Sequence, residues 1–230
     1  MTKVIGNGLI SNAILKCINN SNIEVVFFAS GVSNSLEENP SEFDREKELL
    51  NKTIIDNISI TLVYFSSCSI YEKSTPYTRH KIKMEELVKE KCNSYIIYRL
   101  PQAVGISKNK HTLMNFLYEK IKKKEGFQIL KGARRNIIDV EDVASIAITM
   151  SGEKSLHNKT INIATPHMQP VENIVKAFEE LLHKKAIYDI KGFQESYEIT
   201  IETMSSVIDI DSYFSKNSNI YTKKIIEKYY

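Results

Sequence analysis

The chain opens on the stretch MTKVIGNGLIS, residues 1–11, which decides the kind of fold to expect. A short apolar strand leads into Gly6-Asn7-Gly8, and an amphipathic helical pattern follows over residues 9–19. In such a G-x-G-x-x-S turn the first glycine permits the tight bend, and the second lets backbone N–H groups at the helix N-terminus approach a pyrophosphate. Ser11, in place of a third glycine, is still small enough for the helix to contact the strand.

A second stretch, residues 66–81, combines hydroxyl groups with a Tyr-x-x-x-Lys pair. The cluster Ser66-Ser67-Cys68-Ser69 ends an apolar strand, and Tyr77 and Lys81 open an amphipathic helix. Positions i and i+4 of a helix lie one above the other on the same face. The ammonium of Lys81 would therefore favour the phenolate of Tyr77, and Ser67 could hold the oxygen that exchanges a proton with it. These groups suit acid/base chemistry on a carbonyl or carbinol.

Strand and helix patterns alternate along the chain, which predicts an α/β fold with a parallel sheet. The strand at 23–29 is almost continuously apolar, as strands buried on both faces are. Ser41 is the expected N-cap of the helix that follows it. Up to residue 125, the other expected elements are strands 59–65 and 95–100 and helices 41–56, 76–91 and 111–124. Beyond residue 125 we expect strand 127–130, helix 140–151, strand 160–164 and helix 170–183. Over residues 208–230 we expect a strand, a short Asp-capped helix and a closing helix.

Further segments complete a recognisable order of motifs. They are Ala29-Ser30-Gly31, RLPQAVG at 99–105, RNIIDVEDV at 135–143 and TINIA at 160–164. Together with the glycine turn and the Ser–Tyr–Lys stretch, they resemble the extended short-chain dehydrogenase/reductase superfamily. The resemblance is to its NAD-dependent epimerase/dehydratase family, whose members modify nucleotide sugars, and this chain would be an unusually short member.

The resemblance implies a fold and an activity. The fold is a Rossmann-like doubly wound parallel sheet, truncated in its first half, with a small interwoven C-terminal lobe. Residues 1–125 would form the dinucleotide-binding core and residues 126–230 the substrate-facing lobe. The implied protein is an enzyme that uses NAD or NADP to reduce or epimerise a nucleotide sugar in polysaccharide or deoxysugar synthesis. A homodimer is common in the family.

The resemblance also assigns roles to individual residues. The catalytic residues would be Ser67, Tyr77 and Lys81. The substrate would be bound by Ser67, Cys68 and Arg135, whose guanidinium suits a diphosphate. The cofactor would be held by Gly6, Gly8, Leu9, Ile10, Ala29, Ser30, Gly31, Tyr77, Lys81 and Pro101.

The chain departs from the family pattern in its first half. The family spends two further strand–helix units before the Ala29 turn, whereas one helix intervenes here, so the first strand should lie at or near a sheet edge. The strand that carries the acidic ligand of the adenosine ribose is missing. Glu24 has the required spacing of about 20 residues, but it precedes its strand and would lie at the wrong end of the sheet. The adenine pocket is then open, filled by a partner chain or too weak to hold a dinucleotide.

Three functional classes remain open. Within the first, a nucleotide-sugar enzyme, we favour a 4-keto reductase or an epimerase, since dehydratases of the family carry an Asp-Glu pair where this chain has Cys68-Ser69. The second class is a Rossmann-fold binding or regulatory protein with weakened catalysis, because a fold does not fix a function. The third is a reductase of a non-sugar carbonyl, in which Arg135 would have no anionic group to hold.

Composition argues against several other classes. With 230 residues, 42% hydrophobic and 26% charged, the chain is typical of a globular α/β domain. The net charge of +3 is spread out, and the lysine run at 120–124 reads as a solvated helix end, so we expect no nucleic-acid or membrane partner. Apolar runs reach about eight residues, against the ~20 of a membrane span. Cys17, Cys68 and Cys92 show no metal spacing and follow no secretory signal, which predicts a cytoplasmic protein with reduced thiols and no metal.

Overall fold

A computed structural model describes all residues of the chain except 1, 19–22, 73, 108, 111 and 195–196. Its centre is a five-stranded parallel sheet in the order β1-β2-β3-β4-β9. The strands are β1 (Lys3–Ile5), β2 (Val25–Phe28), β3 (Thr61–Ser67), β4 (Tyr95–Leu100) and β9 (Lys159–Asn162). The prediction of a Rossmann-like α/β fold is confirmed, and β1 lies at the edge of the sheet, as the missing units predicted.

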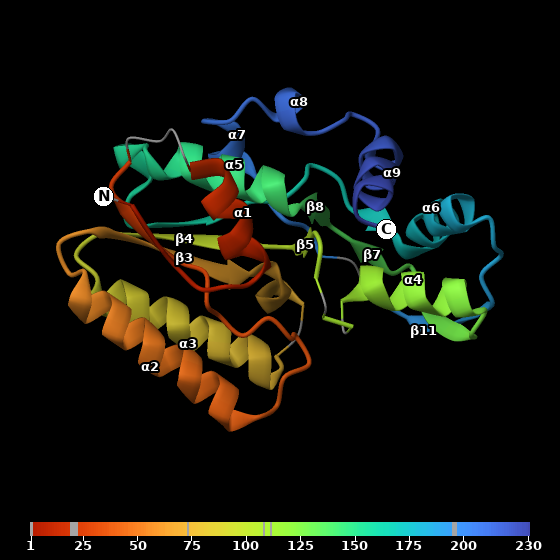
Figure 1. The fold of residues 1–230 in the computed structure, drawn as a ribbon, viewed down its shortest axis with the longest axis horizontal. Helices are drawn as coiled ribbons and strands as arrows, with labels where there is room; N and C mark the ends of the chain where they lie inside the picture. The colour runs from red at the N-terminus through yellow and green to blue at the C-terminus, as the bar shows by residue number, and fades with distance from the viewer. Residues whose placement is uncertain (1, 19–22, 73, 108, 111, 195–196) are drawn as a thin grey trace.

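Helices cover both faces of this sheet (Figure 1). On one face, α1 (Leu9–Cys17) packs against α5 (Val140–Ser151), and both contribute to the larger hydrophobic core. On the other face, α2 (Pro40–Asp56) and α3 (Pro76–Lys91) bury Leu50 and Met84 against the sheet in a second core. The sheet is therefore buried on both sides, which explains why its central strands are almost entirely apolar.

The connections between neighbouring strands do not all have the same hand. Each step along the sheet runs in the same direction, yet α1 and α5 cross on one face while α2 and α3 cross on the other. About 98% of parallel βαβ crossovers are right-handed, and those through α2 and α3 have that hand (Figure 1). The step from β1 to β2 runs in the same direction as the steps through α2 and α3, but α1 lies on the opposite face of the sheet from those two helices. The β1–α1–β2 connection is therefore left-handed.

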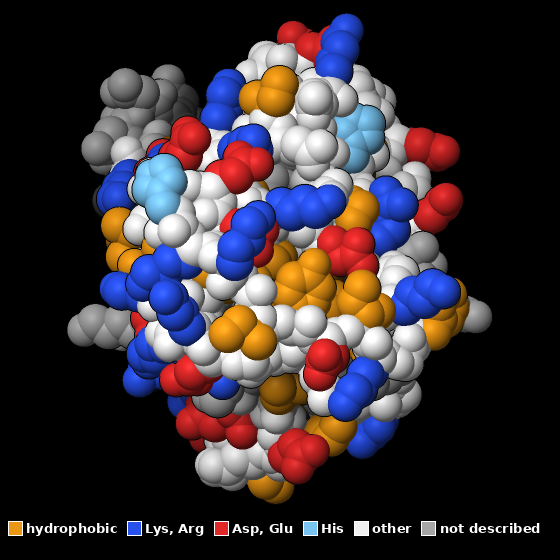
Figure 2. All heavy atoms as spheres, turned by 90° about the vertical axis from the view of Figure 1, so that its right-hand side faces the viewer, with side chains coloured by type: hydrophobic (Ala, Val, Ile, Leu, Met, Phe, Trp, Pro, Cys, Tyr) orange, Lys and Arg blue, Asp and Glu red, His pale blue; other side chains and the backbone are white. Residues whose placement is uncertain are grey.

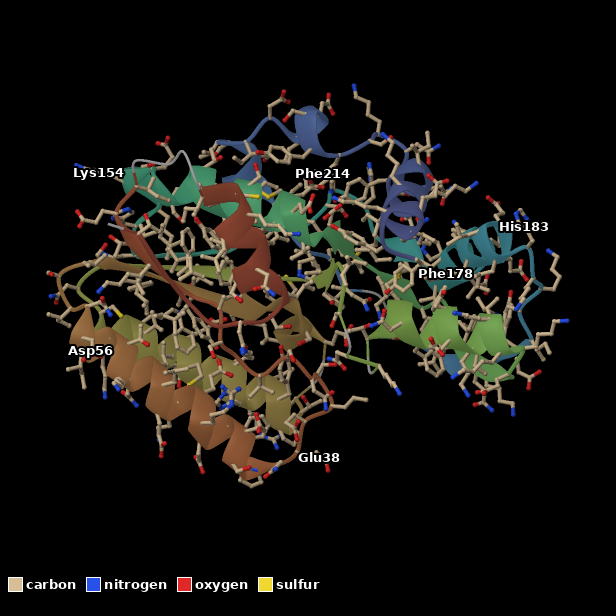
Figure 3. The ribbon with its side chains drawn as sticks, in the orientation of Figure 1. Glu38, Asp56, Lys154, Phe178, His183 and Phe214 are labelled. Carbon is tan, nitrogen blue, oxygen red and sulfur yellow. The ribbon has the colours of Figure 1, made fainter. Side chains whose placement is uncertain are left out.

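A smaller part of the molecule lies beyond the carboxyl ends of the strands. It contains α4 (Leu113–Lys123), α6 (Val171–Leu182) and α9 (Ser218–Tyr229). Phe178 of α6 packs edge-to-face against the ring of Tyr230 and lies tilted beside the ring of Tyr118. Figure 3 shows Phe178 between α6 and α4. Figure 2 shows apolar, basic and acidic side chains intermingled on this face of the molecule. The division at residue 125 stays a prediction, and α5 and β9, from the second range, belong to the central layers.

Short strand pairs join this part to the central sheet. They are β5 (Gln102–Val104) with β8 (Ile137–Asp139), β6 (Phe127–Lys131) with β11 (Tyr188–Phe193), and β7 (Arg134–Arg135) with β10 (Gln169–Pro170). The remaining elements are the 3-10 turns η2 (Cys68–Tyr71) and η3 (Lys154–Leu156) and the short helices α7 (Glu202–Ser205) and α8 (Ile210–Tyr213).

Two local predictions were wrong. The N-cap of α2 is Asn39, whose side chain accepts from the backbone N–H of Ser41, so Ser41 already lies inside the helix. The strand expected within residues 208–230 is absent from the described residues, whereas the short Asp-capped helix expected there is present as α8, capped by Asp209. The Asp209 carboxylate accepts from the backbone N–H of Asp211, and this local bond overrides the alternating apolar pattern.

Within the described ranges, no helix is both long and apolar enough to cross a membrane.

Candidate active site

The glycine turn lies at the carboxyl end of β1, in contact with the end of β2. Gly6 has a φ of +130°, and a Cβ placed on it would lie 2.4 Å from the carbonyl oxygen of Ala29. The backbone N–H of Ala29 donates to Ile5 at 2.8 Å. Only glycine can adopt this backbone and permit the approach. Gly6 and Ala29, both predicted to hold the cofactor, are thus neighbours.

The N-terminus of α1 adjoins the glycine turn and has no side-chain cap. Gly8 is the N-cap and provides no side-chain cap, the first turn holds no acidic residue, and a Cβ on Gly8 would have no atom within 4 Å. The first N–H groups of a helix have no partner within it, so those of Leu9 and Ile10 can donate to a ligand. These residues fit the pyrophosphate of a dinucleotide.

The residue that follows β5, Gly105, packs against the N-terminus of α1. Gly105 is buried, and a Cβ on it would lie 2.7 Å from Leu9 Cδ1 and 2.6 Å from Val140 Cγ1. Pro101, the remaining residue predicted to border the cofactor, joins β4 to β5 and accepts from the N–H of Ala103 at 3.0 Å. The carboxyl ends of β1, β2 and β4 therefore line one edge, where open α/β sheets bind ligands.

Ser67, Tyr77 and Lys81 lie around the carboxyl end of β3. Ser67 ends the strand, and its hydroxyl accepts from the N–H of Ser69 at 3.1 Å and shares a 2.7 Å hydrogen bond with the Ser69 hydroxyl. Tyr77 is 7% exposed in the first turn of α3, and the Lys81 ammonium lies 5.8 Å from the centre of its ring. The expected placement of Tyr77 and Lys81 on one helix face is confirmed.

The Lys81 ammonium belongs to a buried ion pair. Lys81 is 2% exposed and donates to Glu46 Oε1 at 3.0 Å and to the Tyr64 hydroxyl at 3.2 Å. The ammonium rests against Gly31, where an added Cβ would lie 2.5 Å from Nζ. The predicted cofactor residue Gly31 and the predicted catalytic residue Lys81 are therefore in contact, with Glu46 beneath them.

Glu46 is fully buried and remains ionised. Its carboxylate also accepts from the Val32 N–H at 2.7 Å, the Tyr64 hydroxyl at 2.7 Å and His80 Nε2 at 3.0 Å. Burial by itself would raise the pKa of Glu46, but the charge of Lys81 and these hydrogen bonds hold that pKa well below its usual range. Burial and the Glu46 carboxylate together raise the pKa of Tyr64 well above its usual value. The charge of Lys81 is thus compensated within the protein.

Cys68 follows Ser67 and is fully buried. Its Sγ lies 4.0 Å from Asn162 Oδ1 at the end of β9. Burial raises the pKa of the Cys68 thiol to about 12, so the thiol stays protonated near neutral pH and is a poor nucleophile. Tyr71, at the end of the same turn, donates to Asn162 Oδ1 at 3.0 Å and accepts from Arg99 at 2.9 Å.

Arg135 is held by the segment that follows β11. Its Nη1 and Nη2 both donate to Gln194 Oε1 at 3.2 Å, and Nη1 also donates to the Arg134 carbonyl. The ring of Tyr197, a few residues on, lies tilted with its centre 6.4 Å from that of Tyr71. Gln194 therefore takes the paired donors of Arg135 that were expected to face a diphosphate.

A cavity of about 830 Å³ opens beside Arg134 and Tyr197. Its size falls within the ~300–1,000 Å³ of small-molecule sites. Its other polar lining residues include Asn136, Glu198, Lys216 and Ser218.

The matching family pattern carries the description NAD dependent epimerase/dehydratase family and covers residues 9–164. The chain belongs to this family. By that description its members are NAD-dependent enzymes, the class and cofactor that the sequence predicts. No curated protein sequence matches the chain.

Solved structures with the same fold include three proteins of low sequence identity. A UDP-galactose 4-epimerase has a TM-score of 0.75 at 14% identity, covering 99% of this chain and 98% of its own. MoeE5, in complex with UDP-glucose and NAD, has a TM-score of 0.74 at 15% identity, with 98% and 97% covered. RMD from Pseudomonas aeruginosa, complexed with NADPH, has a TM-score of 0.72 at 11% identity, with 97% and 98% covered. These likenesses support the Rossmann-like fold.

The sequence did not reveal the residues that hold Lys81 and Arg135. Glu46 lies in an amphipathic helix, where a charged residue normally faces solvent. Tyr64 lies in an apolar strand and resembles an ordinary core residue. Gln194 and Tyr197 belong to a stretch without periodicity, and no local signal could have found them.

Proposed function

We propose that the chain is an NAD(P)-dependent oxidoreductase or epimerase of a nucleotide sugar, acting by 4-keto reduction or epimerisation in polysaccharide or deoxysugar synthesis. One observation carries the proposal. In a chain of this family, the glycine turn, Ser67 and the Tyr77–Lys81 turn all lie at the carboxyl ends of parallel strands. The proposal includes a cytoplasmic location and a homodimer.

The proposed roles follow from the chemistry of the side chains. Bound NAD(P) supplies or accepts the hydride. Tyr77 takes the hydroxyl proton of a sugar carbinol in the oxidising direction and returns a proton to a keto sugar in the reducing direction. Ser67 donates to the same substrate oxygen. Lys81, at Gly31, borders the cofactor ribose as one half of an ion pair with Glu46.

The substrate-binding part of the proposal centres on Arg135. Its two terminal nitrogens present a pair of parallel donors, which match two oxygens of a diphosphate. A diphosphate would replace the Gln194 oxygen at those nitrogens. Cys68 lies behind Ser67 and supports the turn. The cavity beside Arg134 is large enough for part of a nucleotide.

Ligand binding tests the proposal directly. Titration with NADH and with NADPH, followed by nicotinamide fluorescence, should saturate, and absence of binding at millimolar ligand would refute the enzyme. Thermal-shift measurements with UDP, GDP, dTDP and CDP should show stabilisation by at least one diphosphate, since a ligand that binds only the native state raises the melting temperature. If none stabilises the protein, a non-sugar carbonyl becomes the better candidate substrate.

A second candidate function rests on the buried Glu46–Lys81 pair. Because the Glu46 carboxylate compensates the charge of Lys81, the ammonium stabilises a Tyr77 phenolate less than an unpaired ammonium would. This favours a binding or regulatory protein that keeps the fold with weakened catalysis. Such a protein would bind nicotinamide nucleotides without turning over any nucleotide sugar.

A further inference from the structure

The open edge of β1 bears on how a dinucleotide can be held. Between α1, which ends at Cys17, and β2, which begins at Val25, the chain spends only residues 18–24. A strand with its crossover helix needs at least about 10–12 residues, so no strand–helix unit fits there. Among the described strands, β1 pairs with β2 alone, and nothing in the sheet lies on its other side.

That missing neighbour is the element that recognises adenosine in the dinucleotide-binding fold. In the strand order 3-2-1-4-5-6, strand 2 lies beside strand 1 on the side away from strand 4. An acidic residue, about 20 positions after the glycines, binds the ribose 2′-hydroxyl there, or an arginine accepts the 2′-phosphate of NADP. In this chain the first strand has lost its neighbour on that side.

The residues that remain near the turn offer no replacement. The run from Gly6 to Asn12 contains no charged residue. The amide of Asn12 donates to the Asn7 carbonyl at 3.4 Å, and the Ser11 hydroxyl donates to the Gly8 carbonyl at 2.9 Å. Glu24, which has the correct spacing, precedes β2 and therefore lies at the opposite end of the sheet from the glycines. Within the glycine turn and the first turn of α1, no charged side chain distinguishes a 2′-hydroxyl from a 2′-phosphate.

In contrast to the adenosine side, the residues that would hold the pyrophosphate and the nicotinamide ribose are present. The uncapped N-terminus of α1 and the open space at Gly8 suit a phosphate, and Gly31, Lys81 and Tyr77 adjoin one another where the nicotinamide ribose would lie. The left-handed crossover preserves this arrangement, because α1 stays packed on α5.

We propose that the chain holds its cofactor by the pyrophosphate and the nicotinamide half, without recognising the adenosine. This rests on the proposed use of NAD(P) and deepens it. The ligand class is a nicotinamide nucleotide of any adenosine substitution. NADH and NADPH bind alike, reduced nicotinamide mononucleotide binds almost as well, and AMP does not compete.

Binding of the full chain to these ligands, at one fixed ionic strength, tests the proposal by nicotinamide fluorescence and calorimetry. The affinities for NADH and NADPH should agree within about threefold, and the mononucleotide should be at most about tenfold weaker, the equivalent of one lost contact of about 1.4 kcal/mol. A preference above about thirtyfold for either dinucleotide would overturn the proposal, as would a mononucleotide that fails to bind while NADH binds. If no nicotinamide nucleotide binds, the proposed function fails and this inference falls with it.

A pair of variants tests whether the pyrophosphate contact at the N-terminus of α1 contributes to the affinity of all three ligands. Gly8→Asp places a carboxylate at the α1 N-terminus and should weaken all three ligands by the same factor, about tenfold or more. Leu15→Asp adds the same charge to an exposed position of the same helix and should leave all three affinities unchanged within about twofold. Loss of NADH and NADPH binding in Gly8→Asp, with the mononucleotide unaffected, would contradict the proposal.

Discussion

The two ends of the proposed ligand-binding edge differ in how much protein surrounds them. On the nicotinamide side, β2, β3, α2 and α3 converge and bury Glu46, Tyr64 and Lys81 in one hydrogen-bonded cluster. On the adenosine side, the three residues of β1 form the last strand of the sheet. The difference teaches that a sheet can lack units at its edge and still form a buried polar cluster at its centre.

The reason lies in how α1 is held. Its Ala13 and Ile14 are buried in the same core as Val143 and Ala147 of α5, so α1 depends on a helix rather than on the missing strands. The consequence is an unusual topology, because the shortened connection from β1 through α1 to β2 is left-handed. A crossover of that hand is tolerated here because side chains on both helices fix the face on which α1 lies.

The largest effect is expected from Tyr77→Phe, which removes the proposed acid/base of the nicotinamide side. Turnover should fall by about 10²–10⁴-fold, the usual contribution of a positioned general acid or base. NADH affinity should change little because the ring remains. Steady-state kinetics and NADH titration measure the two effects.

Tyr71→Phe is the matched control for this variant. It also removes one tyrosine hydroxyl near Ser67, but that hydroxyl is engaged with Arg99 and Asn162. Its turnover should fall far less. Full turnover in Tyr77→Phe would remove the proposed acid/base.

Glu46→Gln should strongly lower the free energy of unfolding, because it breaks the buried ion pair on the nicotinamide side. Removing one partner of a buried ion pair costs about 3–5 kcal/mol, which urea unfolding at pH 7 can measure. The folded-state pKa of Glu46 is depressed, so its stabilisation is present above the unfolded value of 4.5 and is lost as pH falls. The difference between wild type and variant should therefore shrink below about pH 4.5.

Glu42→Gln, on the same helix, serves as its control. Glu42 pairs with Arg45 at 3.1 Å, and both side chains are about half exposed. An exposed pair of this kind contributes about 0–1 kcal/mol. Equal losses in the two variants would mean that the buried cluster has no special weight.

Gly6→Ala should cost an intermediate amount, because it strains the turn that the two sides share. The positive φ and the approach to the Ala29 carbonyl predict a loss of about 2–3 kcal/mol in the free energy of unfolding. Gly8→Ala should cost about 1 kcal/mol or less, since its φ is −87° and the space is open. Chemical denaturation compares them, and similar losses would contradict the described turn.

The smallest effect is expected from Glu24→Gln on the adenosine side. Glu24 lies at the far end of the sheet from the glycines, so affinities for NADH and NADPH should change by less than about twofold. A selective loss of NADH affinity would mean that Glu24 reaches the ribose, and the comparison between the two sides would no longer hold.

The sequence by itself determined several helices and strands and the edge position of β1. The expected α3, β4 and α5 agree with the structure at 76–91, 95–100 and 140–151, since each has a strong local pattern. The edge position of β1 followed from length, because too few residues separate α1 from β2 to form another unit. The i, i+4 spacing likewise fixed Tyr77 and Lys81 on one face.

Only the tertiary structure decided what those residues touch. Glu46 meets Lys81 across 35 positions, and Gln194 meets Arg135 across 59. Periodicity describes a residue's own helix or strand, and it carries no information on which distant side chain fills the space opposite. The hand of the first crossover was hidden for the same reason, since contacts between α1 and α5, far apart along the chain, decide it.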